Sequence, residues 1–242
     1  MEPAAYRQML ALQDTHWWFR TRRRILSVLL QRFVPVGDRV LEVGAGTGAN
    51  LPLLARWGAV TALEPSRFAA DHLVRHYDVE VVRGAVPSIQ TKDLGEFHLI
   101  AALDVLEHID DDDGALGCIA ECLRPGGWLL ITVPAFAFLW SSHDEALHHK
   151  RRYRLPELLA KLDTAGFAVA YGSYYNGLLF LPALAIRLAD RMRRGSARAG
   201  ATRTVAPLDR LLEFVFGLET KLIGRLGLPF GLSIVVLARK PD

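Results

Sequence analysis

Apolar residues recur at helical spacing through the first part of the chain. Between residues 6 and 33 they line one face of a helix, and the Pro-Val-Gly sequence at 35–37 ends the pattern. The next apolar segment, 39–43, is short and continuous, as in a buried strand. The sequence GAGTG at 44–48 follows and opens a helix that ends near residues 57–58. The pattern predicts a helical N-terminal segment, then a strand, a glycine-rich turn and a helix.

Short strands and amphipathic helices then alternate along the chain. Further strands are predicted at 59–63, 79–82, 97–102, 128–133, 167–171 and 232–238, with helices at 66–76, 115–123 and 155–165. Strands that are joined through helices run parallel and are covered on both faces. We therefore predict an α/β fold, with a doubly wound and mostly parallel sheet.

The segment 172–231 interrupts this alternation. It contains an apolar run at 178–186, a basic stretch at 187–194, a linker-like sequence at 195–202 and a second amphipathic helix at 208–223. The apolar run is too short to span a bilayer. We expect this insertion to form a hydrophobic acceptor pocket, or to contact a membrane monolayer through residues 174–194. A purely structural helical cover or a homodimer face is the alternative.

The composition is apolar and only weakly basic. Mean hydropathy is +0.17, yet no unbroken apolar run reaches the roughly 18–20 residues of a membrane span. No basic segment followed by an apolar one opens the chain, so we expect a cytoplasmic protein, with peripheral contact at the inner membrane face as a variant. A net charge of +3 without a basic stripe argues against a nucleic-acid partner. Cys118 and Cys122 are expected to be buried, reduced thiols.

The glycine-rich turn indicates a nucleotide cofactor. A strand that runs into glycines and then into a helix directs free backbone N–H groups at a ligand. Read as Gly44-x-Gly46-x-x-Ala49 the turn fits a dinucleotide fingerprint, so an NAD(P)-dependent oxidoreductase is one alternative. The fuller pattern places Glu42 before the glycines and Gly48 after them, closer than the dinucleotide spacing, and favours a cofactor without a pyrophosphate. Glu64 follows the next strand about 20 residues later, where an acid can accept both hydrogen bonds of a ribose diol.

Four motifs together resemble the class I S-adenosylmethionine-dependent methyltransferases. They are VLEVGAGTG at 40–48, ALEPS at 62–66, ALDVLEHI at 102–109 and LRPGGWLLITVP at 123–134. The last two are similar to the branch of the ubiquinone and menaquinone pathway methyltransferases. The resemblance implies a seven-stranded sheet whose last strand, 232–238, is antiparallel. It also implies S-adenosylmethionine as cofactor and S-adenosylhomocysteine as product.

The same resemblance assigns the cofactor-binding residues. Gly44, Gly46 and Gly48, with Glu42 before them, would line the methionine and ribose parts, and Glu64 with Pro65 would hold the ribose. Ala85 would offer backbone to the adenine, in a position where many relatives carry an acid. The methionine end would be bordered by Leu103 and Asp104.

The resemblance also explains the sequence DTHWWFRTRRRIL at 14–26. In this branch an N-terminal helix closes over the cofactor, and an arginine contacts the methionine carboxylate. Arg24 holds the corresponding place, with Arg20 and Arg23 as neighbouring candidates, and a bidentate guanidinium suits that carboxylate. Trp17, Trp18 and Phe19 would then cover the site and exclude water. We also expect Trp17 and Trp18 to contact the substrate. The alternative is a helix that packs its aromatic residues on the core and leaves the arginines in solvent.

Methyl transfer to a hydroxyl needs a group that removes the proton. Histidine is suited to this because its pKa lies near neutrality. His143, after the fifth predicted strand, is our first candidate for the base, and His108, after the fourth, is the second. Either could equally be a capping or packing group.

The loop HHKRRY at 148–153 suggests further substrate contacts. His148, Arg152 and Tyr153 could clamp an anionic acceptor, although a solvated basic loop fits equally well. Tyr175 is a further candidate for an acceptor contact. The acids at 110–113 are expected to cap a helix N-terminus. No group of Cys, His and Asp has the spacing of metal ligands, so no metal is expected.

The sequence therefore predicts four segments. They are a helical lid at 1–37, a cofactor-binding core at 38–171, the insertion at 172–231 and a closing strand at 232–242. The predicted function is methyl transfer to an oxygen of a small or lipophilic metabolite, of the isoprenoid, glycolipid or secondary-metabolite type. A methyltransferase-like binding protein without turnover is the second alternative, beside the oxidoreductase.

Overall fold

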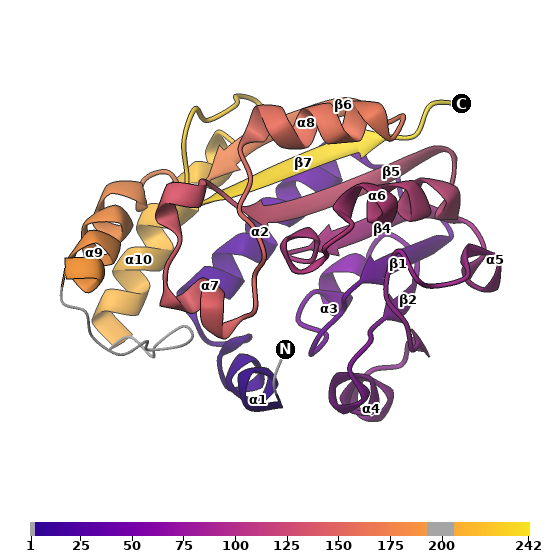
Figure 1. Ribbon diagram of the computed structural model, residues 1–242, viewed down its shortest axis with the longest axis horizontal. Coiled ribbons are helices and arrows are strands. Elements are labelled where there is room, and N and C mark those ends of the chain that lie inside the picture. The colour runs from indigo at the N-terminus through magenta and orange to yellow at the C-terminus, as the bar shows by residue number, and fades with distance from the viewer. Residues whose placement is uncertain (1–2, 193–205) are drawn as a thin grey trace.

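The computed structural model describes residues 3–192 and 206–242 as a central sheet between two layers of helices (Figure 1). The seven strands lie in the order β3-β2-β1-β4-β5-β7-β6, and β7 runs antiparallel to both of its neighbours. The strands are β1 (Arg39–Val43), β2 (Ala59–Leu63), β3 (Glu80–Val82), β4 (Phe97–Leu103), β5 (Leu123–Pro134), β6 (Ala168–Tyr175) and β7 (Ser233–Arg239). The predicted doubly wound sheet with an antiparallel last strand is confirmed.

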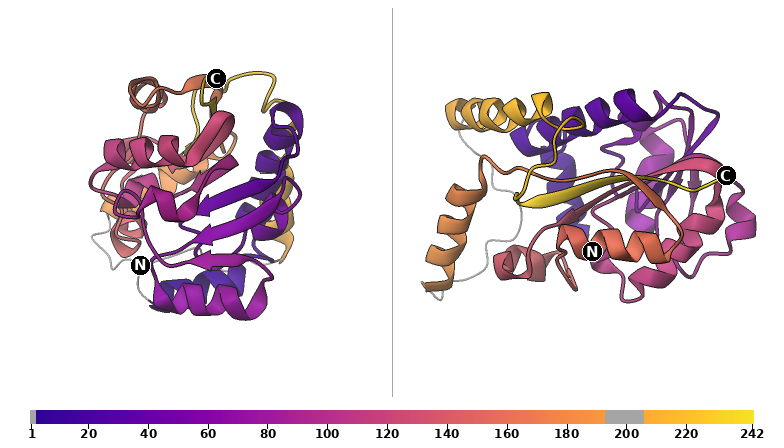
Figure 2. Two further views of the ribbon diagram at one scale, coloured as in Figure 1. Left: turned by 90° about the vertical axis from the view of Figure 1, so that its right-hand side faces the viewer. Right: turned by 90° about the horizontal axis from the view of Figure 1, so that it is seen from above.

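Helices cover both faces of the sheet, as the two views in Figure 2 show. One buried cluster joins α5, α6 and α8 to the sheet, and another joins α2, α3, α4 and α10 to its opposite face. The helices are α1 (Pro3–Leu12), α2 (Trp17–Phe33), α3 (Leu51–Leu54), α4 (Arg67–His76), α5 (Thr91–Leu94), α6 (Asp112–Cys122), α7 (Ser142–Ala146), α8 (Leu155–Thr164), α9 (Phe180–Met192) and α10 (Ala206–Gly217), with 3-10 turns η1 (Leu106–His108), η2 (Ala137–Leu139) and η3 (Leu218–Lys221).

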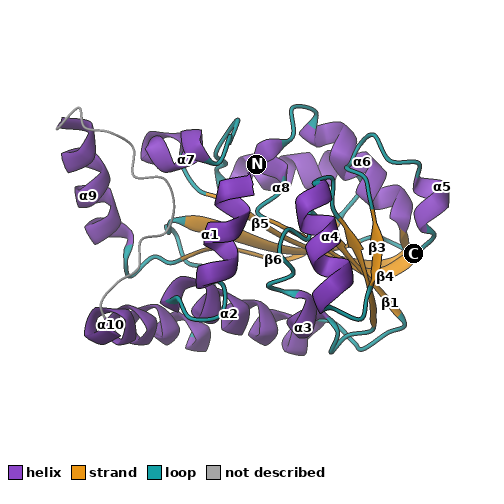
Figure 3. Ribbon diagram, turned by 90° about the horizontal axis from the view of Figure 1, so that it is seen from below, coloured by secondary structure: helices purple, strands orange, loops and turns teal. Residues whose placement is uncertain are grey.

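The predicted single N-terminal helix is in fact two helices. Helix α1 ends at Leu12, and α2 begins at Trp17 after the turn residues Asp14 and Thr15, which favour turns over helix interiors. The side chain of His16 accepts a hydrogen bond from the backbone of Trp18 and caps α2. The break lets α1 leave the direction of α2 and lie beside α4 at the carboxyl edge of the sheet (Figure 3).

Several element boundaries differ from the sequence pattern. The sixth strand extends to Tyr175, and the second helix of the insertion ends at Gly217 before the 3-10 turn η3. The predicted linker at 195–202 lies outside the described residues. Asp111 caps α6 by accepting from the backbone of Gly114 at 2.9 Å, as the acid run predicts. Cys118 and Cys122 are buried free thiols, also as predicted.

Within the part of the chain that the structure describes, no helix has the length and apolar character needed to cross a membrane.

Candidate functional site

The glycine-rich loop after β1 turns through left-handed backbone. Gly44, Gly46 and Gly48 have φ values of 65°, 57° and 84°, which residues with a side chain rarely adopt. A Cβ at Gly44 would lie 2.7 Å from the side chain of Val105, so the glycine loop packs closely against the turn that follows β4. At Gly46 a Cβ would meet nothing nearer than the carbonyl oxygen of Gly44, at 3.9 Å. Gly46 therefore faces an open side of the loop, where a ligand can approach the backbone.

Glu64 follows β2 and directs its carboxylate at this loop. The buried carboxylate accepts hydrogen bonds from the backbone N–H groups of Gly46 at 2.8 Å and Ser66 at 2.9 Å. A third donor is the hydroxyl of Tyr6 in α1, at 3.0 Å. Burial, together with the nearby Glu64 carboxylate, raises the pKa of Tyr6, so the hydroxyl stays protonated and donates. Helix α1 thus closes over the acid that the sequence predicts for the ribose.

This arrangement fits the adenosine part of S-adenosylmethionine. The carboxylate at the end of β2 can accept from a ribose diol, and the open backbone at Gly46 allows a close approach. The other predicted cofactor residues also follow strands of the parallel part of the sheet. Pro65 lies after β2, Ala85 after β3, and Leu103 ends β4. The carbonyl oxygen of Ala85 already accepts from Ser88 and Ile89 within its own turn.

A buried arginine connects α2 to the ends of β4 and β5. The Arg22 guanidinium lies 2.8 Å from the carboxylate of Asp104 and donates to the Thr132 hydroxyl at 2.8 Å. Thr132 in turn donates to Asp104 at 3.0 Å. Burial alone would lower the pKa of Arg22, but Asp104, Tyr175 and Glu42 together outweigh burial, and the pKa is raised. Arg22 is therefore charged, and it holds Asp104 in place at the predicted methionine end.

The structure places Arg22, and not Arg24, beside Asp104 at the predicted methionine end. The Arg24 side chain is 60% exposed and pairs with Glu213 of α10 at 2.9 Å. Arg20 also pairs with Glu213, and Arg23 donates to the carbonyl oxygen of Gln13. Two residues along a helix rotate a side chain by about 200°. Arg22 therefore faces the sheet, whereas Arg24 faces solvent and α10.

Glu42 supports the glycine loop from below. Its Oε1 accepts from the Asn50 amide at 2.8 Å, and Asn50 accepts from Arg22 at 3.5 Å. Burial raises the pKa of Glu42 to about 7, and the Asn50 hydrogen bond and the Arg22 charge oppose that shift. Glu42 is buried, with an exposed fraction of 1%. Its predicted contact with the cofactor is therefore corrected to a supporting contact through Asn50.

The aromatic residues of α2 divide between two surroundings. The Trp17 ring packs edge-on against Phe216 of α10, with centroids 5.9 Å apart. The Trp18 ring lies 5.3 Å from the Arg22 guanidinium and contacts Phe19 at 4.9 Å. Trp17 thus belongs to the contact between α2 and α10, as the packing alternative held, and its predicted role as a substrate contact is corrected. The predicted role of Trp18 at the acceptor side remains a prediction.

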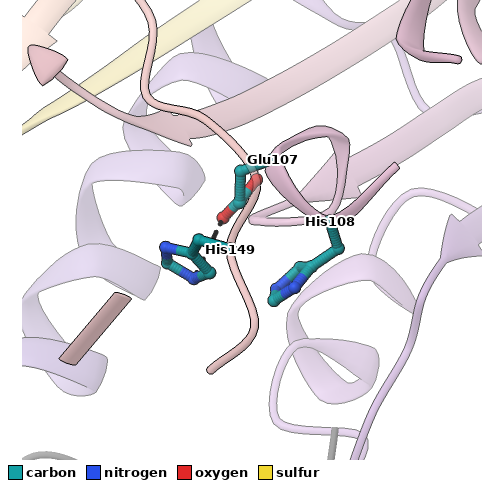
Figure 4. A group of neighbouring side chains, drawn as sticks. All are labelled: Glu107, His108 and His149. Atoms are coloured by element: carbon teal, nitrogen blue, oxygen red, sulfur yellow. Dashed lines mark ion pairs between the residues drawn. The ribbon is translucent and has the colours of Figure 1, made fainter. Parts of the chain in front are cut away.

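Three histidines gather beyond the ends of β4 and β5. The ring centroids of His108 and His149 are 4.7 Å apart, and those of His143 and His149 are 6.4 Å apart. Burial lowers the pKa of both His108 and His143 to about 4. Both imidazoles are therefore neutral at pH 7, although a pKa of about 4 makes each a weaker base than a free histidine, whose pKa near neutrality is the reason the sequence points to it. Figure 4 shows Glu107, His108 and His149 as neighbours, with a dashed line between Glu107 and His149.

Arg152 has a structural partner, which corrects its predicted role as a substrate clamp. It is buried and donates to both carboxylate oxygens of Asp144, at 2.7 and 2.9 Å, and to the carbonyl oxygen of Ala135. Asp144 also accepts from the Nδ1 of His149 at 2.9 Å and from the backbone of Ser141 at 2.8 Å. Burial would raise the pKa of Asp144, but these donors outweigh it and hold the pKa well below its usual value. The pair therefore fixes the loop that carries His149.

The two predicted tyrosines are also enclosed. Tyr153 is 0% exposed and donates to Asp112 at 2.8 Å. Tyr175 is likewise 0% exposed and stacks on Phe216. Both side chains are enclosed in the core, and the Tyr153 hydroxyl is held by Asp112, so the structure shows core packing for both tyrosines where the sequence predicts substrate contacts. His148 is exposed at the loop turn with φ of 58°, and its substrate role stays a prediction.

Sequence reasoning missed Arg22, Tyr6, Glu107 and His149. Helical phase could have selected Arg22, because it shares a face with the apolar residues of α2. Glu107 and His149 are far apart in sequence. Glu107 lies in the loop after β4 and His149 in the loop after β5, and the pairing of these two strands brings the loops together. No signal in the sequence identifies Tyr6, because its role depends on the break after α1.

The molecule is a doubly wound α/β protein with a site suited to a cofactor that contains a nucleoside. The strand order, the glycine loop after β1 and the acid after β2 are the features that define this class. The chain belongs to the methyltransferase domain family, which it matches over residues 17–171. S-adenosylmethionine is therefore the cofactor, and this finding favours it over the nicotinamide dinucleotide that the glycine pattern left open.

One known protein is similar in sequence, and two solved structures share the fold. The chain is 30% identical over 176 residues to a ubiquinone biosynthesis O-methyltransferase of Xanthomonas axonopodis pv. citri, covering 65% of this chain and 72% of that protein. The N-methyltransferase NodS of Bradyrhizobium japonicum WM9, in complex with S-adenosylhomocysteine, has the same fold, with a TM-score of 0.60, 14% identity, and coverage of 99% of this chain and 98% of that one. The [4+2]-cyclase SpnF also shares the fold, with a TM-score of 0.59, 21% identity, and coverage of 93% and 82%.

Proposed function

We propose that this methyltransferase acts on a hydroxyl oxygen of a lipophilic small molecule. The observation that carries the proposal is the group of neutral histidines beyond β4 and β5, next to the strand end that carries Asp104. An oxygen acceptor must lose its proton as the methyl group arrives, and a neutral imidazole can take it. The Xanthomonas relative carries an O-methyltransferase name, which supports oxygen as the acceptor atom.

The chain's own residues divide the work in this proposal. S-adenosylmethionine supplies a methyl group on a positively charged sulfur. Gly46 and Glu64 would hold its nucleoside, and Arg22 with Asp104 would fix the methionine end. An imidazole nitrogen of His143 would take the proton of the acceptor hydroxyl. Alignment of the acceptor with the methyl group accounts for much of the rate in such a displacement.

The exchange of His143 for asparagine tests the acceptor chemistry. The probe is a short-chain polyprenyl catechol, whose methyl ether is measured by mass spectrometry. We expect turnover to fall by about 10²–10⁴-fold in the His143→Asn variant, because the proton acceptor is lost. Affinity for S-adenosylhomocysteine should not change, since His143 contacts none of the predicted cofactor residues.

His76→Asn is the matched control, because His76 is an exposed histidine of α4 without a predicted role in the site. It should keep the turnover of the unchanged protein. Equal turnover in the His143 and His76 variants contradicts the role of His143. A product methylated on carbon or nitrogen contradicts oxygen as the acceptor atom.

Exposed apolar side chains favour a lipophilic acceptor. Helices α9 and α10 lie at the end of the molecule toward which β4 and β5 point (Figure 1). Leu181 of α9 is 70% exposed and Phe214 of α10 is 66% exposed, and Arg210 lies near Phe214. Apolar and basic side chains together suit the surface of an anionic monolayer, where a lipophilic acceptor would be found.

A double exchange of Leu181 and Phe214 to glutamate tests this contact. We expect the unchanged protein to co-sediment with vesicles that contain phosphatidylglycerol, and the variant to bind at least about 10-fold less, because two large apolar side chains no longer enter the monolayer. Val74→Glu on α4 is the control, since Val74 is 66% exposed on another helix. Failure of the unchanged protein to co-sediment contradicts the contact. A dimer in light scattering that the double variant loses would assign this end to a second copy instead.

A further inference from the structure

Helix α1 covers the acid that the site offers to a ribose. Glu64 is only 2% exposed. The buried Tyr6 ring of α1 lies against Phe68 of α4, with ring centroids 6.0 Å apart, and its hydroxyl donates to Oε1 of Glu64 at 3.0 Å. Figure 3 shows α1 beside α4 at this edge of the sheet. A ligand that needs the Glu64 carboxylate therefore cannot reach it while α1 keeps this position.

The hydrogen bonds of Glu64 lead to the same conclusion. A carboxylate has about four acceptor positions, two on each oxygen. Among the described residues, the backbone N–H of Ser66 and the Tyr6 hydroxyl donate to Oε1, and the backbone N–H of Gly46 donates to Oε2. A ribose diol donates two further hydrogen bonds, which is more than the remaining capacity. Since Gly46 and Ser66 belong to the turns that build the site, the Tyr6 hydroxyl is the donor that can leave.

Helix α1 is attached to the molecule in a different way from α2. The core cluster on one face of the sheet includes four residues of α2, which are Ile25, Leu26, Leu29 and Leu30. Of the described side chains of α1, the buried Tyr6 and Leu12 belong to neither core cluster. Helix α1 can therefore leave its place without unpacking the core, whereas α2 cannot.

The turn between α1 and α2 offers a pivot for such a movement. The side chain of Gln13 is buried and accepts from the Thr47 hydroxyl of the glycine loop at 2.5 Å. The carbonyl oxygen of Gln13 accepts from Arg23 of α2 at 2.7 Å. Gln13 thus fixes the end of α1 to the glycine loop and to α2. A rotation of α1 about this point would free Glu64 and leave α2 with Arg22 in place.

We propose that Tyr6 gates the cofactor site. In the protein without cofactor, the Tyr6 hydroxyl holds the place of a ribose hydroxyl on Glu64, and S-adenosylmethionine binds only after α1 has moved away. Tyr6 and the ribose compete for one acceptor position, so the fraction of the protein that Tyr6 closes lowers the apparent affinity for the cofactor. The inference concerns entry of the cofactor and does not depend on the acceptor chemistry proposed above.

The exchange of Tyr6 for phenylalanine tests the competition. Phenylalanine keeps the ring that packs on Phe68 but cannot donate to Glu64. We expect the Tyr6→Phe variant to bind S-adenosylhomocysteine about 10-fold more tightly, because a hydrogen bond to a charged group stabilises the closed form by at least about that factor. A tyrosine that instead contacts the bound cofactor predicts weaker binding, the opposite sign. Isothermal titration measures the affinity.

Tyr171→Phe is the matched control. It also removes one phenolic hydroxyl, which donates to the carbonyl oxygen of Leu226 at 2.8 Å. Tyr171 lies on β6, at the opposite edge of the sheet from β2 and β3. We expect this variant to bind S-adenosylhomocysteine as the unchanged protein does.

Hydrogen exchange gives a second measurement, on the protein without substitutions. With saturating S-adenosylhomocysteine, the backbone amides of residues 6–12 should exchange faster than without it, because α1 has left Glu64. The amides of residues 25–30 in α2 should keep their protection, because that helix stays packed on the sheet. In Tyr6→Phe the amides of residues 6–12 should exchange faster already without ligand.

Three results would overturn the proposal. One is equal or weaker binding of S-adenosylhomocysteine by Tyr6→Phe. Another is slower exchange of residues 6–12 when S-adenosylhomocysteine binds to the unchanged protein, since α1 would then close on the bound ligand instead of making way for it. The third is the absence of binding in all three proteins, which would refute the gate together with the role of Glu64 in holding the ribose.

Discussion

Replacement of Glu64 by glutamine is expected to weaken binding of S-adenosylhomocysteine by at least about 100-fold. The carboxylate would accept two hydrogen bonds from the ribose, and hydrogen bonds to a charged group contribute about 1.5–3 kcal/mol each. Glutamine keeps the shape but loses the charge and one acceptor atom. Isothermal titration of each protein with S-adenosylhomocysteine measures the change.

Glu80→Gln is the matched control for this variant. Glu80 opens β3, next to the strand that leads to Glu64, and accepts from the Thr61 hydroxyl at 2.8 Å. It is exposed, so its exchange should leave the affinity unchanged. Equal affinities of the Glu64 and Glu80 variants would show that the acid after β2 does not hold the nucleoside.

Replacement of Arg22 by methionine is expected to lower the free energy of unfolding by about 3 kcal/mol. Removing one partner of a buried ion pair leaves the other charge unpaired, at a cost of about 3–5 kcal/mol. The low end applies because the Asp104 side chain is 31% exposed. Urea denaturation of the variant and the unchanged protein at pH 7 measures the difference.

Arg24→Met separates burial from charge in this comparison. It removes the same charge from the same helix, but from a side chain that is 60% exposed. Exposed ion pairs contribute about 0–1 kcal/mol, so we expect a correspondingly small loss. A larger loss for Arg24 than for Arg22 would contradict the stabilising role of the buried Arg22–Asp104 ion pair.

The fold was predictable because each strand is a separate apolar segment. β1, β2 and β4 are short, continuous and bounded by glycine, proline or acidic residues, so their order along the chain already indicates a parallel sheet. Glu64 was predictable for a related reason. An acid directly after the second strand must lie at the edge where the glycine loop also turns.

The arrangement of the acceptor side was less accessible from the sequence. Tyr153 and Arg152 stand in a basic loop that looks solvated, but Tyr153 is buried against Asp112 of α6 and Arg152 against Asp144 of α7. Such burial depends on tertiary packing, which local composition does not encode. The choice between Arg22 and Arg24 likewise turned on the phase of a helix that begins later than its apolar pattern suggests.

The central claim is that the loop after β1 and Glu64 bind S-adenosylmethionine. Thermal unfolding with S-adenosylhomocysteine, NADH or NADPH tests it most directly. At 100 times the dissociation constant a ligand adds about 2.7 kcal/mol of stability, which raises the Tm of a chain of this size by roughly 5–10 °C. We predict that rise with S-adenosylhomocysteine and none with either nicotinamide cofactor. A rise with NADH or NADPH, and none with S-adenosylhomocysteine, would contradict the account.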